Sequence, residues 1–240
     1  MNDFAISLAD ARPLVASPLW PRIRAFLWDF ASLCDPARLA AAAGGSGDAA
    51  PRSLDPRSSP RLARAAERAL GLSPFFHHFP ATDASRLLLL SREDYDRLAQ
   101  FLGVVAFAPA LRRITAGADV RALRAALPGV YPATLAFTAY FRRHEPLFER
   151  LVPAGEAANP AVVCSAGHRL LAAALSDLPP ALLLRQRLRF PEGSPADAAL
   201  AREASPDGRA PSRPDSPAAF AAAKLALKLS NPAESAVLFP

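Results

Sequence analysis

The chain has 240 residues, 51% of them hydrophobic, and this content argues against a wholly disordered protein. A globule of this length buries roughly 70% of the surface that its unfolded chain exposes, so its core needs neither disulfides nor a structural metal. The formal charge is +6, but the basic residues are scattered and form no block of about five or more like charges, so the charge alone does not indicate a nucleic-acid-binding tail.

The N-terminal residues and the cysteines bear on the cellular compartment. Asp3 and Asp10 lie where a secretion signal has a positive charge followed by a long apolar run, so we expect no signal peptide. The longest nearly uncharged apolar run, residues 101–111, is too short to span a bilayer. Cys34 and Cys164 form no CxxC motif, and we expect both to be small, reduced apolar residues. We therefore expect a cytoplasmic protein.

Local composition divides the chain into five segments. Two of them are rich in Pro, Gly and Ser and lack the large apolar side chains whose burial would offset the entropy of ordering. The predicted segments are an N-terminal segment docked on the core (1–40), a flexible loop (41–58), a helical core (59–190), a Pro-rich flexible linker (191–216), and a C-terminal helix with a tail (217–240).

Two tryptophans mark the N-terminal segment. Trp20 and Trp28 stand eight residues apart, so a helix would place both side chains near one face. They would belong either to a helix docked on the core or to an exposed aromatic anchor for a partner, because Trp is a frequent hot-spot residue. The docked helix is the favoured interpretation, and the anchor stays open.

Helix start and stop signals recur through the central segment. Pro60 suits the first position of a helix capped by Ser59, and Gly71 is the expected stop. Ser91 and Asp94 have capping-box spacing at the start of the next helix. The apolar residues of that helix recur at i, i+3, i+4 and i+7, which is one helix face: Leu98, Phe101, Leu102 and Val105.

Three further helices are predicted downstream. Asp119 is the expected cap of a helix that continues to Leu127, and residues 131–143 form the next, which is rich in aromatic side chains. Ser165 is the expected cap of a helix whose apolar face continues to Leu178.

Residues 184–190 permit two interpretations. Arginines at every second position alternate with leucine, glutamine or phenylalanine, which is close to a strand pattern. Pro180, however, suits the first position of a helix, Leu and Arg favour helix, and β-branched residues are missing. We favour the helix. Because Val, Ile and Thr are scarce throughout, we expect an all-α fold, a single compact multi-helix domain.

The motifs of the chain point to no reaction centre. Residues Cys164–His168 bring a thiol, a hydroxyl and an imidazole together, but a nucleophile elbow requires glycine where Val163 stands. His77 and His78 are adjacent, and neighbouring side chains diverge on a helix, so they make a poor metal site. We expect no metal, no cofactor and no enzymatic activity. An enzyme with an unrecognised polar site is a competing hypothesis.

The order of four segments resembles the SctK/YscK family, cytosolic sorting-platform proteins of bacterial type III secretion systems. The strongest match is DRLAQFLGVVAFAPALRRI, where a leucine-rich helix runs into an alanine–apolar–Arg-Arg segment that ends with Arg112, Arg113 and Ile114. Nearly as good is LRQRLRFP (184–191), with arginine–leucine alternation before a proline. PLW near the N-terminus and the late AFAAAKLALKL complete the resemblance, which covers residues 17–190 with a weaker tail.

The resemblance implies an adaptor that is needed for protein secretion. Such an adaptor would connect the cytoplasmic domain of SctD, the inner-membrane ring protein, to cytosolic pods of SctQ. Those pods hold the stator SctL and the secretion ATPase. The resemblance also implies a cytoplasmic position at the inner-membrane base of the apparatus, with no catalytic residues to carry over.

An acidic partner would be bound by arginines. The candidate partner-binding residues are Arg112, Arg113, Arg185, Arg187 and Arg189. Around Arg185, Arg187 and Arg189, the neighbouring leucines would pack inward while the arginine stems cover the rim of an interface. A solvated helix face is one alternative. Another is an arginine-rich nucleic-acid-binding protein, which would carry a basic stripe on one face and bind with salt-sensitive affinity.

Overall fold

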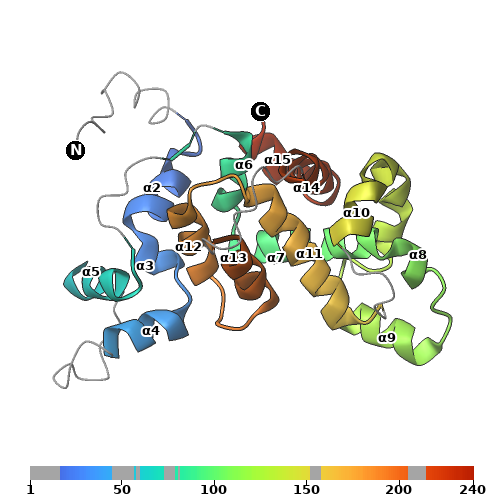
Figure 1. Ribbon diagram of the computed structural model, residues 1–240, viewed down its shortest axis with the longest axis horizontal. Coiled ribbons are helices and arrows are strands. Elements are labelled where there is room, and N and C mark those ends of the chain that lie inside the picture. Colours follow the sequence, from blue (N-terminus) through green and yellow to red (C-terminus); the bar gives the residue numbers. More distant parts are fainter. Residues whose placement is uncertain are drawn as a thin grey trace.

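The computed structural model describes residues 17–44, 57, 60–72, 79–80, 82–151, 158–204 and 215–240. The described residues form helices joined by turns and contain no strand, which confirms the predicted all-α class (Figure 1). The elements in chain order are α2 (Trp20–Trp28), α3 (Phe30–Leu33), α4 (Pro36–Gly44), α5 (Pro60–Ala69), α6 (Asp83–Arg86), the 3₁₀ helix η2 (Leu87–Leu89), α7 (Arg92–Ala106), α8 (Ala108–Leu111), α9 (Gly117–Ala126), the 3₁₀ helix η3 (Ala133–His144), α10 (Glu145–Leu151), α11 (Pro160–Leu175), α12 (Pro180–Leu188), α13 (Pro195–Ala204), α14 (Ser216–Ser230) and α15 (Pro232–Leu238).

The centre of the molecule is the crossing of α7 and α11. The two backbones touch at Gly103 and Gly167, where an added Cβ would overlap the carbonyl oxygen of Val163 and that of Ala99, respectively. Glycine is required here because any side chain would push the helices apart. α11 also packs against α13 and α14, so most of its length is buried.

Several predicted helix ends are confirmed. Ser91 accepts a hydrogen bond from the backbone amide of Asp94, as a capping residue should. Pro60 and Pro180 each occupy the first position of a helix. Gly71 follows α5 with a φ of 75°, a conformation that favours glycine. The predicted cap Ser59 lies outside the described residues.

Two predicted caps and one helix type are wrong. α11 begins at Pro160 with Asn159 as its cap, so Ser165 lies within the helix. Asn159 accepts from the amide of Val162, and the Asn-Pro pair is a stronger start signal than a serine five residues later. α9 begins at Gly117, which leaves Asp119 in its first turn rather than at its cap. Residues 133–144 form a 3₁₀ helix and not an α-helix.

The predicted flexible linker 191–216 is also corrected, because residues 195–204 form α13. Ala196, Ala199 and Leu200 are buried against the core, and Ser194 accepts a hydrogen bond from the amide of Asp197 in the first turn. Small apolar residues at helical spacing supply the buried face that the abundance of proline in this segment concealed. Residues 205–214 lie outside the described part of the chain.

The N-terminal segment docks on the core through two layers. In α2, Ile23, Phe26 and Leu27 join the main core, which confirms the docked helix. The next three helices, α3, α4 and α5, form what we call the N-terminal layer, and they enclose a second apolar cluster. Its buried members are Phe30, Ala31, Cys34, Leu39, Ala66, Leu72 and Leu188.

The predicted loop 41–58 begins later than expected, since α4 continues to Gly44, and most of the remainder lies outside the described residues. Cys34 and Cys164 are both free thiols. None of the helices in the described part of the chain combines the length and the apolar character needed to cross a membrane.

Candidate protein-binding surface

The arginines at 185, 187 and 189 do not form an exposed row. They lie on a helix, so Arg185 and Arg189, four positions apart, share one face while Arg187 points to another side. That shared face is buried: Arg185 is 3% exposed and Arg189 is 5% exposed. The expectation of a charged rim formed by all three arginines is therefore wrong. Arginines at every second position line one face only if the segment is a strand, because on a helix residues i and i+2 point to different sides.

Arg189 organises the turn between η2 and α7 from inside the protein. Its guanidinium donates to the carbonyl oxygens of Leu88 (2.8 Å) and Leu90 (2.7 Å) and to the side-chain oxygen of Gln186 (2.8 Å). Burial lowers the pKa of Arg189 to about 10, so the side chain still carries its charge at neutral pH. The residue satisfies buried carbonyl groups and is not available to a partner.

Arg185 and Arg187 make similar structural contacts. Arg185 donates to the carbonyl oxygen of Phe26 at 3.3 Å, and its guanidinium lies 5.3 Å from the centre of the Phe30 ring. Arg187 donates to the carboxylate of Asp197 on α13 at 2.6 Å. Burial raises the pKa of Asp197, but the hydrogen bonds from Arg187 and the Gly193 amide outweigh it and hold that pKa below its usual value.

Arg112 and Arg113 do lie on the surface, in the turn after α8. Both side chains are exposed. Arg112 donates to the carbonyl oxygen of Leu135 at 3.1 Å and to the hydroxyl of Thr138, so it holds this turn against η3. Arg113 makes no ion pair with a carboxylate among the described residues. Arg112 therefore borders η3, and Arg113 is exposed beside it in the same turn.

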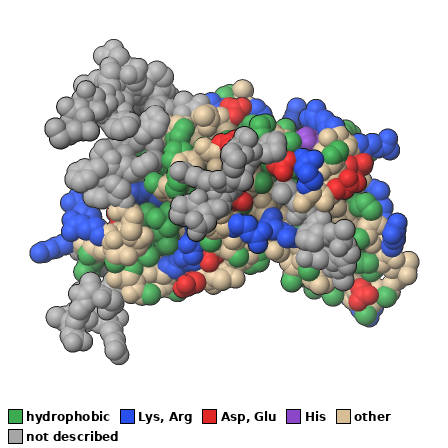
Figure 2. All heavy atoms as spheres, in the orientation of Figure 1, with side chains coloured by type: hydrophobic (Ala, Val, Ile, Leu, Met, Phe, Trp, Pro, Cys, Tyr) green, Lys and Arg blue, Asp and Glu red, His purple; other side chains and the backbone are tan. Residues whose placement is uncertain are grey.

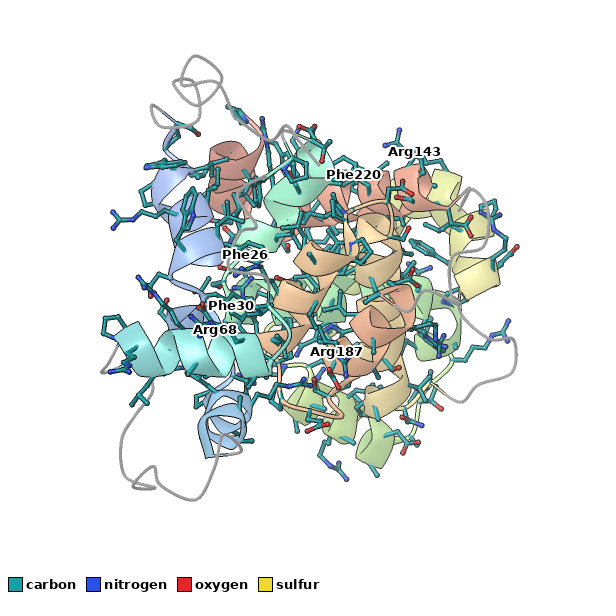
Figure 3. The ribbon with its side chains drawn as sticks, turned by 60° about the vertical axis from the view of Figure 1, so that its left-hand side comes forward. Phe26, Phe30, Arg68, Arg143, Arg187 and Phe220 are labelled. Carbon is teal, nitrogen blue, oxygen red and sulfur yellow. The ribbon has the colours of Figure 1, made fainter. Side chains whose placement is uncertain are left out.

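The outer side of η3 presents an aromatic residue next to arginines. Tyr140 is 62% exposed, the highest value among the large hydrophobic residues in the described ranges. Arg142 and Arg143 follow it on the surface, and Figure 3 labels Arg143 on this element. We call the set Arg112, Arg113, Tyr140, Arg142 and Arg143 the η3 surface. Sequence reasoning missed the last three, although the signal, an aromatic residue followed by Arg-Arg, is present in YFRR.

The η3 surface rests on a rigid aromatic base. Phe137 contacts both Tyr140 and Phe101, with ring centres 6.4 and 6.1 Å apart, and Phe101 belongs to α7. Phe141 is buried between Phe101 and Phe148. The exposed tyrosine is thus the outermost ring of a stack that reaches the core. Little side-chain entropy would be lost when a partner covers it.

The charge of this end of the molecule is positive. Residues 107–151 contain seven arginines against Asp119, Glu145 and Glu149. Figure 2 shows Lys and Arg side chains around α8, α9 and α10, with a smaller acidic area beside them. His144 adds no charge at neutral pH, because burial and then the positive charge of Arg143 lower its pKa. The η3 surface therefore suits an acidic partner.

The other polar groupings offer less for chemistry. Burial raises the pKa of the Cys164 thiol, which keeps it protonated. His168 lies 3.5 Å from a carboxylate oxygen of Asp96, but burial lowers the pKa of the imidazole to about 4. This contact is thus not an ion pair at neutral pH. Within the described ranges, no three His, Cys, Asp or Glu side chains are grouped as a metal site would need.

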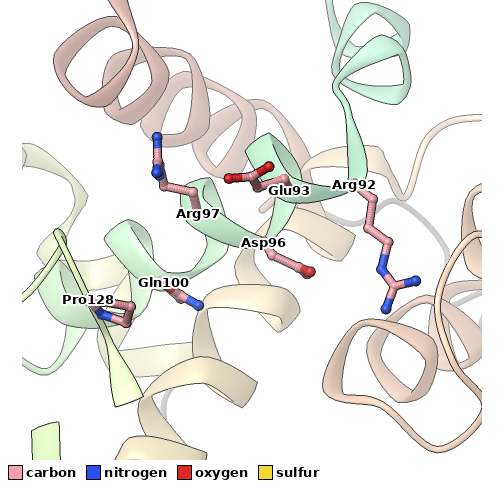
Figure 4. A pocket seen from close by; sticks show the side chains of 6 residues that line it. All are labelled: Arg92, Glu93, Asp96, Arg97, Gln100 and Pro128. Carbon is pink, nitrogen blue, oxygen red and sulfur yellow. The ribbon is translucent and has the colours of Figure 1, made fainter. Parts of the chain in front are cut away.

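One open pocket lies along α7. It has a volume of about 430 Å³ and is lined by Arg92, Glu93, Asp96, Arg97, Gln100 and Pro128. Figure 4 shows Arg92 and Arg97 pointing to opposite sides, so their charges do not converge on one point in the pocket. Arg92 instead pairs with Asp35 at 3.3 Å. His77 and His78, the adjacent histidines of the sequence, lie outside the described residues.

Comparison with known proteins found no match to this chain among protein-family models, curated proteins or solved structures.

Proposed function

We propose that this protein is a cytoplasmic adaptor of a bacterial type III secretion sorting platform. In this role it connects the cytoplasmic domain of SctD to the SctQ pods and, through them, to SctL and the secretion ATPase. The proposal places it at the cytoplasmic side of the inner-membrane base, as a component that protein secretion needs. It assigns binding, and no catalysis, to the chain.

The observation that supports the proposal most is the η3 surface. An exposed tyrosine bordered by arginines has the composition of an interface hot spot. Its ring contacts Phe137, which in turn contacts Phe101 of α7, so the tyrosine is supported by the core. Arg112 and Arg113, at the end of the segment with the strongest family resemblance, belong to it.

The distribution of the resemblance agrees with this assignment. Its two best segments, residues 96–114 and 184–191, contain most of the central helix α7 and the buried arginines Arg185 and Arg189. A sequence pattern carried by packed helices is one that specifies a fold.

The proposal is tested by changing the η3 surface without disturbing the core. The variant Arg113→Glu/Tyr140→Ala/Arg142→Glu alters three exposed side chains. The matched control is Arg97→Glu/Arg202→Glu/Val237→Ala, which makes the same charge change at exposed positions elsewhere. Purified full-length proteins are titrated with the SctD cytoplasmic domain and with SctQ from the same genome.

We expect the η3 variant to lose about 2 kcal/mol or more of binding free energy toward one of the two proteins. The control should bind like the parent protein, and both variants should melt at the parent temperature. If the parent protein binds neither SctD nor SctQ, the adaptor role is refuted. Unchanged binding by the η3 variant would refute the assignment of the surface.

The positive charge of this end also favours the second candidate, a nucleic-acid-binding protein. Glu145 and Glu149, which follow η3 directly, weaken a phosphate-binding surface. Titration with a single-stranded and a double-stranded oligonucleotide at two salt concentrations separates the candidates. Tight binding that falls steeply with salt and is lost in the η3 variant would favour nucleic acid over SctD and SctQ.

A further inference from the structure

The N-terminal layer ends in an amphipathic helix with three arginines on its outer face. Arg61, Arg64 and Arg68 follow one another at i, i+3 and i+7 on α5, and all three side chains are exposed. At 3.6 residues per turn they occupy about 60° of the helix circumference. On the other side of the helix Ala66 is buried and Leu70 packs beside it in the second cluster. We call the three residues the α5 arginine row.

The row is fixed by the layer beneath it. α5 packs against α3 and α4, and Ala66 has no exposed surface. Arg57, three residues before the helix, donates to the carbonyl oxygens of Ala31 (3.2 Å) and Cys34 (2.9 Å). The position of the row is therefore set by the protein itself, and a partner would not have to order it.

The charges of the row are not used within the described part of the chain. No described carboxylate forms an ion pair with Arg61, Arg64 or Arg68. Glu67 lies on the flank of the same helix and is half-buried; burial raises its pKa, and Arg185 influences it more than Arg64 does. The row therefore carries three positive charges toward solvent.

Small residues adjoin the row on one side. Ala65 and Ala69 follow Arg61 and Arg68 around the helix, at about 40° and 80° from Arg61. Side chains this short project little from the helix surface beside the charged row. A second helix can approach such a surface closely while its own polar side chains reach sideways to the arginines.

We propose that α5 is a docking surface for an acidic helix of a partner protein. The spacing of the row along the helix axis is roughly 4.5 and 6 Å, which is the rise over three and four residues. Carboxylates at i, i+3 and i+7, or i+4 and i+7, of a partner helix repeat at the same spacing. Each arginine can then receive one carboxylate in the bidentate geometry that suits its guanidinium.

The surface fits a protein better than a nucleic acid. The row extends over only about 10 Å, whereas phosphate binding gains affinity from contacts spread along a groove. No aromatic side chain lies on the described residues of α5 to stack on a base, and Glu67 places an acid beside the row. The alanines suit the close packing of a helix.

The location of α5 suits an adaptor that binds two proteins, and the identity of the partner at α5 rests on that proposed function. α5 and the α8–α10 end lie at opposite ends of the longest axis of the molecule (Figure 1), and Figure 2 shows basic side chains at both ends. Two proteins bound at these ends would not collide. The adaptor would then hold one partner at the η3 surface and another at the α5 arginine row.

The test uses a synthetic probe and the full-length chain. The probe is a fluorescent, helix-stabilised peptide with Glu at i, i+3 and i+7 and alanine between. A second peptide with Gln at these positions is the probe control. The protein variants are Arg61→Glu/Arg64→Glu/Arg68→Glu and, as the matched control, Arg97→Glu/Arg124→Glu/Arg202→Glu, which makes the same charge change at exposed arginines outside both surfaces. Fluorescence anisotropy measures each affinity at low and at physiological salt.

We expect the Glu peptide to bind the parent protein and the control variant at least tenfold more tightly than it binds the α5 variant. The Gln peptide should bind all three weakly, and a Lys peptide should bind the α5 variant best. Equal binding of the Glu peptide to all three proteins would overturn the proposal. So would an oligonucleotide that binds the row more tightly than the peptide.

The result is independent of the test of the adaptor role. If SctD and SctQ do not bind but the Glu peptide binds through the row, the proposed function fails and the docking surface stands. If SctD and SctQ bind equally to the parent and to the α5 variant, and the peptide fails, the docking surface falls and the adaptor remains. Equal melting temperatures of the α5 variant and the parent establish that the three exposed substitutions leave the fold intact.

Discussion

Arg189 shows how a charged residue serves the interior of this protein. It places three donors against the carbonyl oxygens of Leu88 and Leu90 and the amide oxygen of Gln186. The two carbonyl groups lie at the end of the short helix η2, which has no further turn whose backbone N–H groups could donate to them. These three hydrogen bonds offset part of the cost of burying the guanidinium, whose Nε has no partner among the described residues.

Removing this side chain should therefore cost stability and leave the exposed surfaces unchanged. We expect Arg189→Met to lower the free energy of unfolding by about 3 kcal/mol, because it leaves buried carbonyl groups without donors. Arg202→Met, at an exposed position of α13, should change it by less than about 0.5 kcal/mol. Urea unfolding followed by circular dichroism measures both. Equal midpoints for the two variants would contradict the structural role of Arg189.

His168 makes stability depend on pH. It is almost fully buried against Tyr95, and burial lowers its pKa from 6.5 to about 4. As the pH falls, the unfolded chain takes up this proton before the folded chain does. The contribution of neutral His168 is therefore complete above about pH 6.5 and is lost as the pH falls toward 4, by on the order of 3 kcal/mol in total.

The expected result is a loss of unfolding free energy between about pH 6.5 and 5 that is smaller in His168→Gln than in the parent protein. His144, whose pKa is also lowered, adds to the slope in both proteins, while Asp96, whose pKa is raised by burial, opposes it at the acidic end. The difference between the two slopes isolates His168. Parallel slopes would show that the imidazole titrates normally in the folded protein.

At the scale of elements, the crossing of α7 and α11 determines the arrangement of the core. Gly103 and Gly167 let the two backbones meet, and α13 and α14 pack around α11. The segment Cys164–His168, which brings together groups typical of a catalytic site, instead supplies the contact point of two helices. Its glycine is explained by packing.

Adding one methyl group at this crossing should be strongly destabilising. We expect Gly167→Ala to lower the free energy of unfolding by about 3 kcal/mol or more, because the Cβ would overlap the carbonyl oxygen of Ala99 in a backbone contact that cannot yield. Gly117→Ala is the control: it lies at the start of α9, where the nearest atom is the end of the flexible Arg121 side chain. That variant should be neutral or gain up to about 1 kcal/mol. Thermal unfolding measures both variants, and equal melting temperatures would contradict this account.

At the scale of the whole molecule, charged contacts join layers that are distant in sequence. Asp197 of α13 pairs with Arg187 of α12 and with Arg38 of α4. The N-terminal layer is thereby tied to the core through a helix in the segment predicted to be a linker. Because that layer is fixed, the α5 arginine row and the η3 surface lie at a defined separation along the long axis (Figure 1).

The sequence by itself determined the helical class, the position of most helices and several of their ends. Apolar residues at helical spacing, Ser91 as a cap, and prolines at first positions act locally, within one or two turns, so they can be recognised without a fold. The cap formed by Asn159 and Pro160 is equally local, and it is a stronger start signal than Ser165. The all-α class followed from composition as well as from these signals.

Only the tertiary structure decided which charged residues face water. Arg185 and Arg189 resemble Arg112 and Arg113 in sequence, but the first two are enclosed by α2, the turn after η2, and the core, while the last two border an open surface. Local pattern fixes the direction of a side chain relative to its own helix and not what lies opposite. Burial depends on neighbours far apart in the chain, and for that reason the exposed surfaces at the two ends, η3 and α5, emerged from the packing of the helices.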